Sequence, residues 1–219
     1  MDRSAYKTWG VILSYFFKTL LIILLIISIY KTHWEWIFGA SVGLIVSFVP
    51  AILKRNYQMT LPLFLDLLIA VALILHIGGG ILNAYRDIPY YDVLTHFVSS
   101  FLIAFLAFVI IYILHVYWDG LIMDKYAMGF LVVLFTISMG VVWELNEWIT
   151  DVIFLTHEQW GYTDTIKDLF IDTIAGVVMA ALGINMIKKG SFDEMTDELG
   201  KQIDKKIIKR DKTQEGEKQ

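Results

Sequence analysis

Six long apolar runs succeed one another in this chain of 219 residues and decide what it can fold into. A helix needs roughly 20 mostly apolar residues to cross the hydrocarbon core of a bilayer. The predicted spans lie near Val11–Tyr30, Trp36–Leu53, Leu61–Ile81, Val93–Tyr117, Met128–Trp148 and Asp168–Ile187. The sequence therefore predicts an all-α protein, a polytopic membrane helix bundle of about six transmembrane helices. The first run is the weakest, because Lys18 interrupts it and would have to reach toward an interface.

Composition places the chain in the same class. It is 57% hydrophobic and 15% aromatic, and its mean hydropathy of +0.62 is typical of an integral membrane protein. The absence of cysteine excludes disulfides, thiolate metal sites and cysteine nucleophiles. The basic residues are scattered and form no recognition motif, so membrane lipids, and not nucleic acid, are the expected partners.

Lysine and arginine in the short loops indicate the orientation, because cytoplasmic loops carry more of them. Seven lie on one side of the membrane: Arg3, Lys7, Lys54, Arg55, Lys125, Lys188 and Lys189. Three lie on the other side: Lys31, Arg86 and Lys167. We therefore expect a multi-pass protein of the cytoplasmic membrane with both termini in the cytoplasm. No small-residue cleavage site follows the first run, so a cleaved signal peptide is not expected.

The sequence divides into a transmembrane helical domain over residues 1–187 and a hydrophilic tail over residues 188–219. In the tail, apolar residues recur every three or four positions, which is typical of an amphipathic helix at an interface or on a partner. These residues are Phe192, Met195, Leu199, Ile203 and Ile207. We expect disorder over Asp211–Gln219. A solvated helical tail without a specific partner is the simpler alternative.

Acidic residues and one histidine stand where three of the predicted spans reach the same side of the membrane. They are Asp92 and His96 on the fourth span, Glu144 and Glu147 on the fifth, and Asp164, Asp168 and Asp172 on the sixth. Within each set, spacings of three or four residues put the side chains on one helical face. Ionisable groups at membrane depth are costly, so their convergence indicates a functional site.

The charge of this cluster needs compensation, because several carboxylates at low dielectric cannot all stay ionised. Either some of them are protonated or a cation binds. Oxygen ligands suit Mg²⁺, Ca²⁺ or Mn²⁺, and one imidazole widens the choice to Zn²⁺ or Fe²⁺. The predicted ligands of a divalent metal ion are His96, Glu144, Glu147, Asp168 and Asp172, with Asp92 and Asp164 as the carboxylates that act on water. A metal-free acid/base or proton-handling site and purely structural helix pairing are the alternatives.

Other polar features of the spans carry less information. Asp66 and His76 both lie in the third span, and His76 is near enough to the acidic side to be a further candidate. The three glycines at 78–80 either break that helix or allow another group to approach its backbone closely. No serine triad, phosphate-binding loop or dinucleotide motif is present.

Three ordered segments resemble the YjdF-type family of bacterial inner-membrane proteins. The family pattern is Asp-x3-His-Phe, then Glu-x2-Glu-Trp, then a Gly-Asp-x-Trp-Asp-Thr-x2-Asp stretch. The matching segments here are Tyr91–Phe97 (YDVLTHF), Trp143–Trp148 (WELNEW) and Gly161–Asp168 (GYTDTIKD). The resemblance covers Asp87–Gly183 and implies a polytopic prokaryotic membrane protein with these same site residues, and it implies no reaction.

The chain is also similar, more loosely, to VanZ-like membrane proteins. Those carry Asp-x3-His, a Glu at the end of a helix, and Asp-x3-Asn before a glycine. Here Asp172 takes the place of that Asn, and Ala175 takes the place of the glycine.

Three functions are compatible with the cluster. The favoured one is a metal-dependent enzyme that acts on a lipid or lipid-linked substrate at the extracytoplasmic face, since a polar cluster at headgroup depth reaches amphiphiles. A cation or proton transporter would need a deeper polar pathway, for which Asp66, His115 and Asn185 are the candidates. In a structural or scaffold protein the cluster would only tie three helices together.

Overall fold

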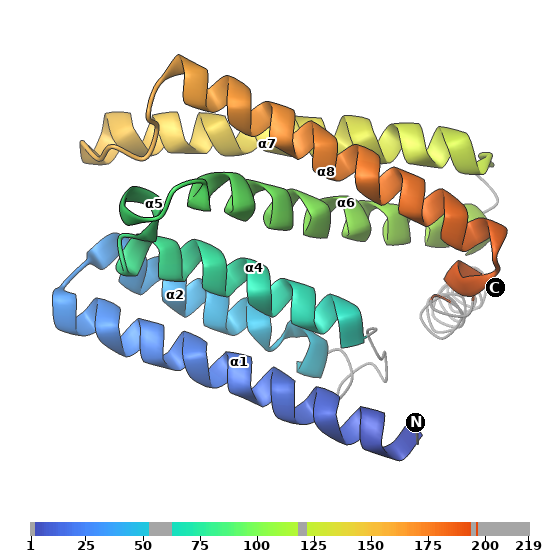
Figure 1. The fold of residues 1–219 in the computed structure, drawn as a ribbon, viewed down its shortest axis with the longest axis horizontal. Coiled ribbons are helices and arrows are strands. Elements are labelled where there is room, and N and C mark those ends of the chain that lie inside the picture. The colour runs from blue at the N-terminus through green and yellow to red at the C-terminus, as the bar shows by residue number, and fades with distance from the viewer. Residues whose placement is uncertain (1–2, 53–62, 118–121, 194–195, 197–219) are drawn as a thin grey trace, which may run out of the picture. The chain divides into compact units, whose positions relative to one another are not determined.

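The computed structural model describes residues 3–52, 63–117, 122–193 and 196. All of the regular elements in this part of the chain are helices (Figure 1). They are α1 (Arg3–Lys31), α2 (Trp34–Ser47), α4 (Leu63–Ile81), α5 (Ala84–Asp87), α6 (Tyr91–Tyr117), α7 (Lys125–Phe154) and α8 (Tyr162–Lys188). The predicted all-α class is confirmed.

Five helices are long and apolar enough to cross a membrane, and they correspond to five of the six predicted spans: Gly10–Lys31, Phe64–Ile81, Tyr91–Val116, Lys125–Phe154 and Tyr162–Lys188. The second predicted span is a shorter apolar helical stretch, Trp36–Ile52. Within it α2 ends at Ser47, and the backbone is helical again over residues 49–52. Pro50 explains the interruption, because proline lacks an N–H and its ring clashes with the carbonyl four residues earlier.

The chain divides into two compact units, residues 1–102 and 103–219, and α6 runs through the boundary. In the first unit α1, α2 and α4 pack against one another in all three pairs. Buried aliphatic side chains of these three helices form the core: Leu21, Leu24, Ala40, Ile77 and Ile81. Burial of such side chains against each other fixes the three helices as one group.

The three consecutive glycines lie inside α4 and do not end it. A Cβ at Gly80 would overlap the ring of Trp36. A Cβ at Gly79 would lie 2.5 Å from Cε2 of Tyr85 and 2.6 Å from Cε1 of Tyr91, both closer than real contacts allow. Of the two sequence interpretations, close approach to the helix is therefore the one that this unit supports. The glycines make room for aromatic rings.

In the second unit α7 and α8 form an antiparallel hairpin joined by residues 155–161 (Figure 1). Small residues bring the two backbones close. A Cβ at Gly176 would lie 3.1 Å from Cβ of Thr136, and a Cβ at Gly140 would overlap the carboxylate of Asp172. These two contacts lie four residues apart on each helix, so one face of α7 follows one face of α8 turn by turn.

The second half of α6 packs in this unit as well. Gly183 of α8 receives the ring of Phe108, where a Cβ would overlap it. Phe192 is fully buried, and its ring centroid lies 5.1 Å from that of Phe108 and 4.8 Å from that of Tyr112. The hydroxyl of Tyr112 donates to Asp193. The first apolar residue of the predicted tail stripe, Phe192, thus belongs to a helical core. Of the tail beyond Phe192, only Asp193 and Thr196 are described.

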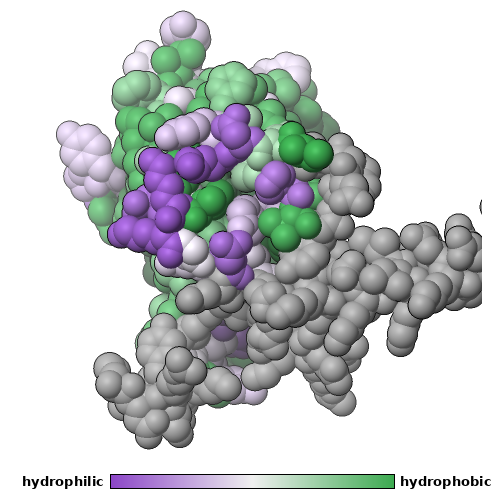
Figure 2. Space-filling model, turned by 90° about the vertical axis from the view of Figure 1, so that its right-hand side faces the viewer, coloured by the Kyte–Doolittle hydropathy of each residue, from purple (hydrophilic) through white to green (hydrophobic). Residues whose placement is uncertain are grey.

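Charged residues mark the end of the α7–α8 hairpin that is opposite its loop. Lys125 begins α7, Lys188 ends α8, and both ammonium groups lie over the ring of Tyr126, at 5.6 and 5.5 Å from its centroid. Figure 2 looks at this end and shows hydrophilic side chains gathered on it, with hydrophobic side chains around them. A polar end on an apolar shaft is typical of a hairpin that spans a bilayer.

Candidate functional site

Asp92 and His96 occupy the first two turns of α6, as their spacing predicts. Nε2 of His96 lies 3.8 Å from Oδ1 of Asp92, and the side chains are 9% and 28% exposed. This separation exceeds that of a hydrogen bond. It falls within the about 3–4 Å expected between two ligand atoms that each lie about 2.1 Å from one ion. The pair has the geometry of a chelating pair on a helix.

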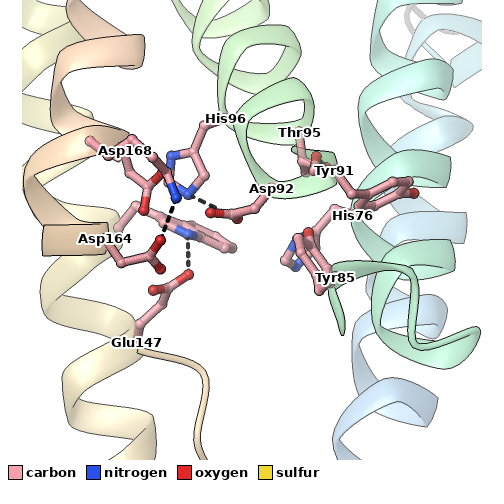
Figure 3. Close-up of polar contacts among 11 residues, drawn as sticks. His76, Tyr85, Tyr91, Asp92, Thr95, His96, Glu147, Asp164 and Asp168 are labelled. Carbon is pink, nitrogen blue, oxygen red and sulfur yellow. Dashed lines mark hydrogen bonds and ion pairs between the residues drawn. The ribbon is translucent and has the colours of Figure 1, made fainter. Parts of the chain in front are cut away.

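A group of aromatic side chains holds the start of α6 against α4. The hydroxyl of Tyr91 donates to the carbonyl of Leu75 at 2.7 Å, which joins the two helices directly. The ring of Tyr91 packs edge-on against Tyr85, with centroids 5.3 Å apart, and the hydroxyl of Tyr85 lies 2.9 Å from Nδ1 of His76. Figure 3 shows this group beside the first turn of α6. It fixes the helix that carries Asp92 and His96.

Sequence reasoning did not identify Tyr85 and Tyr91 as part of the site. Their contacts join residues that are distant in the chain, so no short spacing reveals them. The available signal was the glycine triplet, since glycines inside a helix indicate close approach by a bulky group. His76, a candidate from the sequence, belongs to this aromatic group through Tyr85.

In the second unit three carboxylates are buried at the α7–α8 contact. Glu144, Asp168 and Asp172, which we call the acidic set, are 6%, 2% and 1% exposed. Gly140 faces Asp172 across the contact. One turn further toward the loop, α7 presents Glu144 and α8 presents Asp168, so these two carboxylates stand at the same level. The hairpin therefore buries one predicted ligand from α7 and two from α8.

The basic residues of the hairpin do not balance this charge. The sequences of α7 and α8 contain three lysines and no arginine, and two of those lysines lie at the far end from the loop. The third, Lys167, lies 4.0 Å from Oδ1 of Asp168 and is more closely paired with Asp164. Oε1 of Glu144 is buried and has no hydrogen-bond partner among the described residues. A buried carboxylate in this state is costly unless a cation or proton joins it.

Glu147 and Asp164 are less buried than the acidic set and have local partners. Oε1 of Glu147 accepts a hydrogen bond of 2.8 Å from Nε1 of Trp143, one turn earlier on α7. Asp164 lies in the first turn of α8, which begins at Tyr162, and accepts from Lys167. The helix therefore starts early enough for Asp164 to share a face with Asp168. Figure 3 shows both carboxylates at the loop end of the hairpin.

Asp151, four residues after Glu147 on α7, organises the loop between α7 and α8. Its Oδ1 accepts from the hydroxyl of Thr156 and the backbone N–H of Glu158, both at 2.7 Å. Its Oδ2 accepts from the backbone N–H of Gln159 at 3.0 Å. Three hydrogen bonds to one carboxylate stabilise its ionised form, so its charge does not depend on a bound cation. Asp151 thus has a structural role in the loop.

Two of the three polar residues that a transport pathway would need, Asp66 and His115, have local partners. Asp66 lies 3.9 Å from Nζ of Lys18 within the first unit. Nδ1 of His115 accepts from the backbone N–H of Met123 at 3.2 Å. Lys18 therefore does not extend to an interface, as the sequence suggested, but pairs with a carboxylate of a neighbouring helix.

Comparison with known proteins gives a family. Residues 12–189 match the model of a family described as "Predicted membrane protein (DUF2238)". An uncharacterized protein of Thermotoga maritima is 30% identical over 147 residues, which cover 66% of this chain and 74% of that protein. No solved structure matches the chain.

Proposed function

The chain belongs to the DUF2238 family of predicted membrane proteins, and we propose that it is a membrane enzyme that uses a divalent metal ion on a lipid or lipid-linked substrate. The observation that carries this proposal is the buried carboxylate of Glu144 at the α7–α8 contact, whose Oε1 has no hydrogen-bond partner among the described residues. A bound divalent cation would offset the cost of burying this charge.

The proposed ligands stay those that the sequence predicts, His96, Glu144, Glu147, Asp168 and Asp172. Carboxylates with one imidazole suit Zn²⁺, Mn²⁺ or Fe²⁺. The spacing of Asp92 and His96 supports chelation from one helix, as in helical motifs that bind zinc through residues four apart. The ligand role of Glu147 stays a prediction.

Once bound, the ion would supply Lewis acidity and favour deprotonation of a water molecule. Asp164 is the proposed acceptor of that proton. It lies one turn before Asp168 on α8 and is only partly buried, which leaves its carboxylate accessible to water. Lys167 beside it holds the side chain in place. A general base must first lie within reach of the proton that it accepts, and its pKa matters only after that.

The depth of the acidic set supports a lipid substrate. Glu144 comes 19 residues after Lys125, the first residue of α7. That length of helix is about 28 Å, close to the roughly 30 Å thickness of a hydrocarbon core. Apolar side chains at the same level of α7, among them Val142 and Leu145, are exposed and suited to contact lipid. A site at that depth would meet headgroups.

The finer assignments belong to the same proposal. The YjdF-type resemblance agrees with membership of the DUF2238 family. The excess of basic residues in alternate loops supports a cytoplasmic location of both termini and an extracytoplasmic site. The remaining boundary, between a membrane domain over 1–187 and a tail over 188–219, is proposed from composition.

Lipid turnover by reconstituted protein tests the function. Protein in liposomes of extracted bacterial lipid would be supplied with Mn²⁺, Zn²⁺ or Mg²⁺, and the products identified by mass spectrometry. We expect a metal-dependent change in one lipid class that Asp168→Asn and His96→Gln abolish. Glu158→Gln, which removes a carboxylate from the loop of the same hairpin, is the control that retains turnover.

Cation flux without lipid turnover would contradict the enzyme and favour a transporter. The same liposomes, loaded with a metal-sensitive dye, measure that flux. Loss of folding without a separate loss of turnover or flux in the Asp168→Asn variant would favour the scaffold function.

A further inference from the structure

Two lysines from different helices meet at the end of the α7–α8 hairpin that is opposite its loop. Lys125 begins α7 and Lys188 ends α8, and their ammonium groups lie 5.6 and 5.5 Å from the centroid of the Tyr126 ring. The two charges are therefore no further apart than these two distances together. Like charges held this close repel each other, so the arrangement favours a bound anion.

Carboxylates of the described residues do not neutralise these two lysines. Each ion pair among the described residues uses another basic group. Asp124, next to Lys125, accepts through Oδ1 from two backbone N–H groups in the first turn of α7. Asp193, which follows Lys188 in the chain, accepts from the hydroxyl of Tyr112. The two described acids that are nearest in sequence thus have other partners.

An apolar stripe leads away from the lysines along α7. Tyr126, Phe130 and Leu134 recur every four residues, so they share one face of the helix, and they are 60%, 64% and 44% exposed. The stripe runs about 12 Å along the helix axis. Exposed apolar side chains that adjoin one another mark a surface for lipid or another apolar partner. The hairpin therefore offers two positive charges at its end and an apolar stripe beside them.

The lysines lie at the boundary of the hydrocarbon core when the hairpin spans a bilayer. Residues 126–143 of α7 contain no charged side chain. That length of helix is about 27 Å, close to the roughly 30 Å thickness of a hydrocarbon core. Lipid phosphates lie just outside this core, within reach of lysine side chains. In the proposed orientation this end faces the cytoplasmic leaflet, whose anionic lipids attract lysine.

We propose that Lys125, Lys188 and Tyr126 form a binding site for an anionic phospholipid. The lipid phosphate pairs with the two ammonium groups, and an acyl chain lies along Phe130 and Leu134. The Tyr126 ring holds both lysine side chains near each other before the lipid binds, which lowers the entropy that binding costs. The site lies at the opposite end of α7 from Glu144, so it does not depend on the proposed metal enzyme.

Thermal melting in a mild detergent tests the site. Purified protein would be titrated with phosphatidylglycerol, and with phosphatidylcholine as the zwitterionic comparison. A ligand that binds only the folded protein raises the melting temperature with its concentration, so the titration gives an apparent affinity. We expect stabilisation by phosphatidylglycerol that is about fivefold weaker in affinity in Lys188→Gln and in Lys125→Gln. The double variant should be weaker by about 25-fold, since the two charges contribute separately.

Lys189→Gln is the matched control. It removes the same charge from the next residue, whereas the lysines over the Tyr126 ring are Lys125 and Lys188. Its affinity for phosphatidylglycerol should stay near that of the wild type. An equal loss of affinity in Lys188→Gln and Lys189→Gln would mean that the lipid responds to the general positive charge of this end, and it would overturn the site.

Three further results would overturn the proposal. The first is no stabilisation of the wild type by phosphatidylglycerol, and the second is equal stabilisation by phosphatidylcholine, which would remove any role for the net charge of the lipid. The third is the same lysine-dependent stabilisation by inorganic phosphate alone, which would assign the site to a small anion. Size-exclusion profiles and melting without lipid establish that each variant is folded before affinities are compared.

Discussion

The two units bury charge in different ways. In the first unit, Asp66 of α4 lies 3.9 Å from Lys18 of α1, so a partly buried acid has a basic partner on a neighbouring helix. In the second unit, Glu144, Asp168 and Asp172 are buried together, and α7 and α8 supply one lysine at that end. A pair of opposite charges such as this one stabilises the packing of two helices. In the acidic set, the buried Oε1 of Glu144 has no hydrogen-bond partner among the described residues, and the proposed metal ion would supply one.

The glycines of the two units reinforce the contrast. Gly79 and Gly80 of α4 make room for the rings of Tyr85, Tyr91 and Trp36. Gly140 of α7 makes room for the carboxylate of Asp172 instead. Close approach to a helix backbone serves apolar packing in the first unit and places a charged group in the second. The same residue type thus marks a structural region in one unit and a candidate site in the other.

The largest expected effect concerns the acidic set. Asp168→Asn should abolish the stabilisation that added Mn²⁺ gives the wild type, because it removes a carboxylate that we propose as a metal ligand. Thermal melting with and without Mn²⁺ measures this. Asp66→Asn provides the comparison from the first unit, and it should lower the melting temperature while leaving the Mn²⁺-dependent increase intact. An equal loss of that increase in both variants would remove the distinction between the units.

The next effect concerns the compensated pair. Lys18→Met should lower the free energy of unfolding by about 2 kcal/mol, because it leaves the partly buried carboxylate of Asp66 without its cation. The double variant Lys18→Met/Asp66→Leu should recover most of this loss, since it removes both charges. Unfolding curves in detergent provide the comparison. A double variant as unstable as the single one would show that the pair is not what compensates the charge.

A smaller effect is expected at the glycines of α4. Gly79→Ala should cost about 2 kcal/mol, because its Cβ would displace the rings of Tyr85 and Tyr91. Gly78→Ala is the matched control. Its Cβ would lie 3.7 Å from Leu24, an ordinary contact, so its stability should remain near that of the wild type. Similar melting temperatures for the two variants would mean that the aromatic packing at Gly79 is not tight.

The smallest effect is at the start of α7. Oδ1 of Asp124 accepts from the backbone N–H groups of Tyr126 and Ala127 at 2.7 and 3.1 Å, so it caps the helix. Asp124→Ala should cost about 1 kcal/mol. It should leave Mn²⁺ binding unchanged, because it lies at the far end of α7 from Glu144. Weaker Mn²⁺ binding in this variant would argue that the acidic set responds to general destabilisation of the hairpin.

The sequence predicted the helices well where apolar runs define them, and less well at their polar ends. The fifth predicted span stops at Trp148, whereas α7 continues to Phe154, and α8 begins at Tyr162, six residues before the predicted start. Hydropathy misses these turns because they contain polar residues, among them Asp151 in α7 and Asp164 and Lys167 in α8. The break after Ser47 was also missed, although Pro50 signals it.

Helical spacing predicted which acidic residues share a face, but spacing does not give their partners. Trp143 binding Glu147 and the loop N–H groups binding Asp151 arise from local geometry that hydropathy does not encode. Whether Glu144 of α7 stands at the same height as Asp168 of α8 depends on how closely the two helices pack. That closeness comes from Gly140 and Gly176, whose four-residue spacing from Glu144 and Asp172 is visible in the sequence and was not used.

Elemental analysis of purified protein is the most direct test of the metal site. The wild type and Asp168→Asn would be prepared in parallel without chelators, dialysed, and analysed for divalent metals by mass spectrometry. We predict at least one divalent ion per chain in the wild type, removed by chelator, and only background in Asp168→Asn. The same background metal content in both proteins, after loading with Mn²⁺ and Zn²⁺, would contradict a metal site and leave protons to neutralise the acidic set.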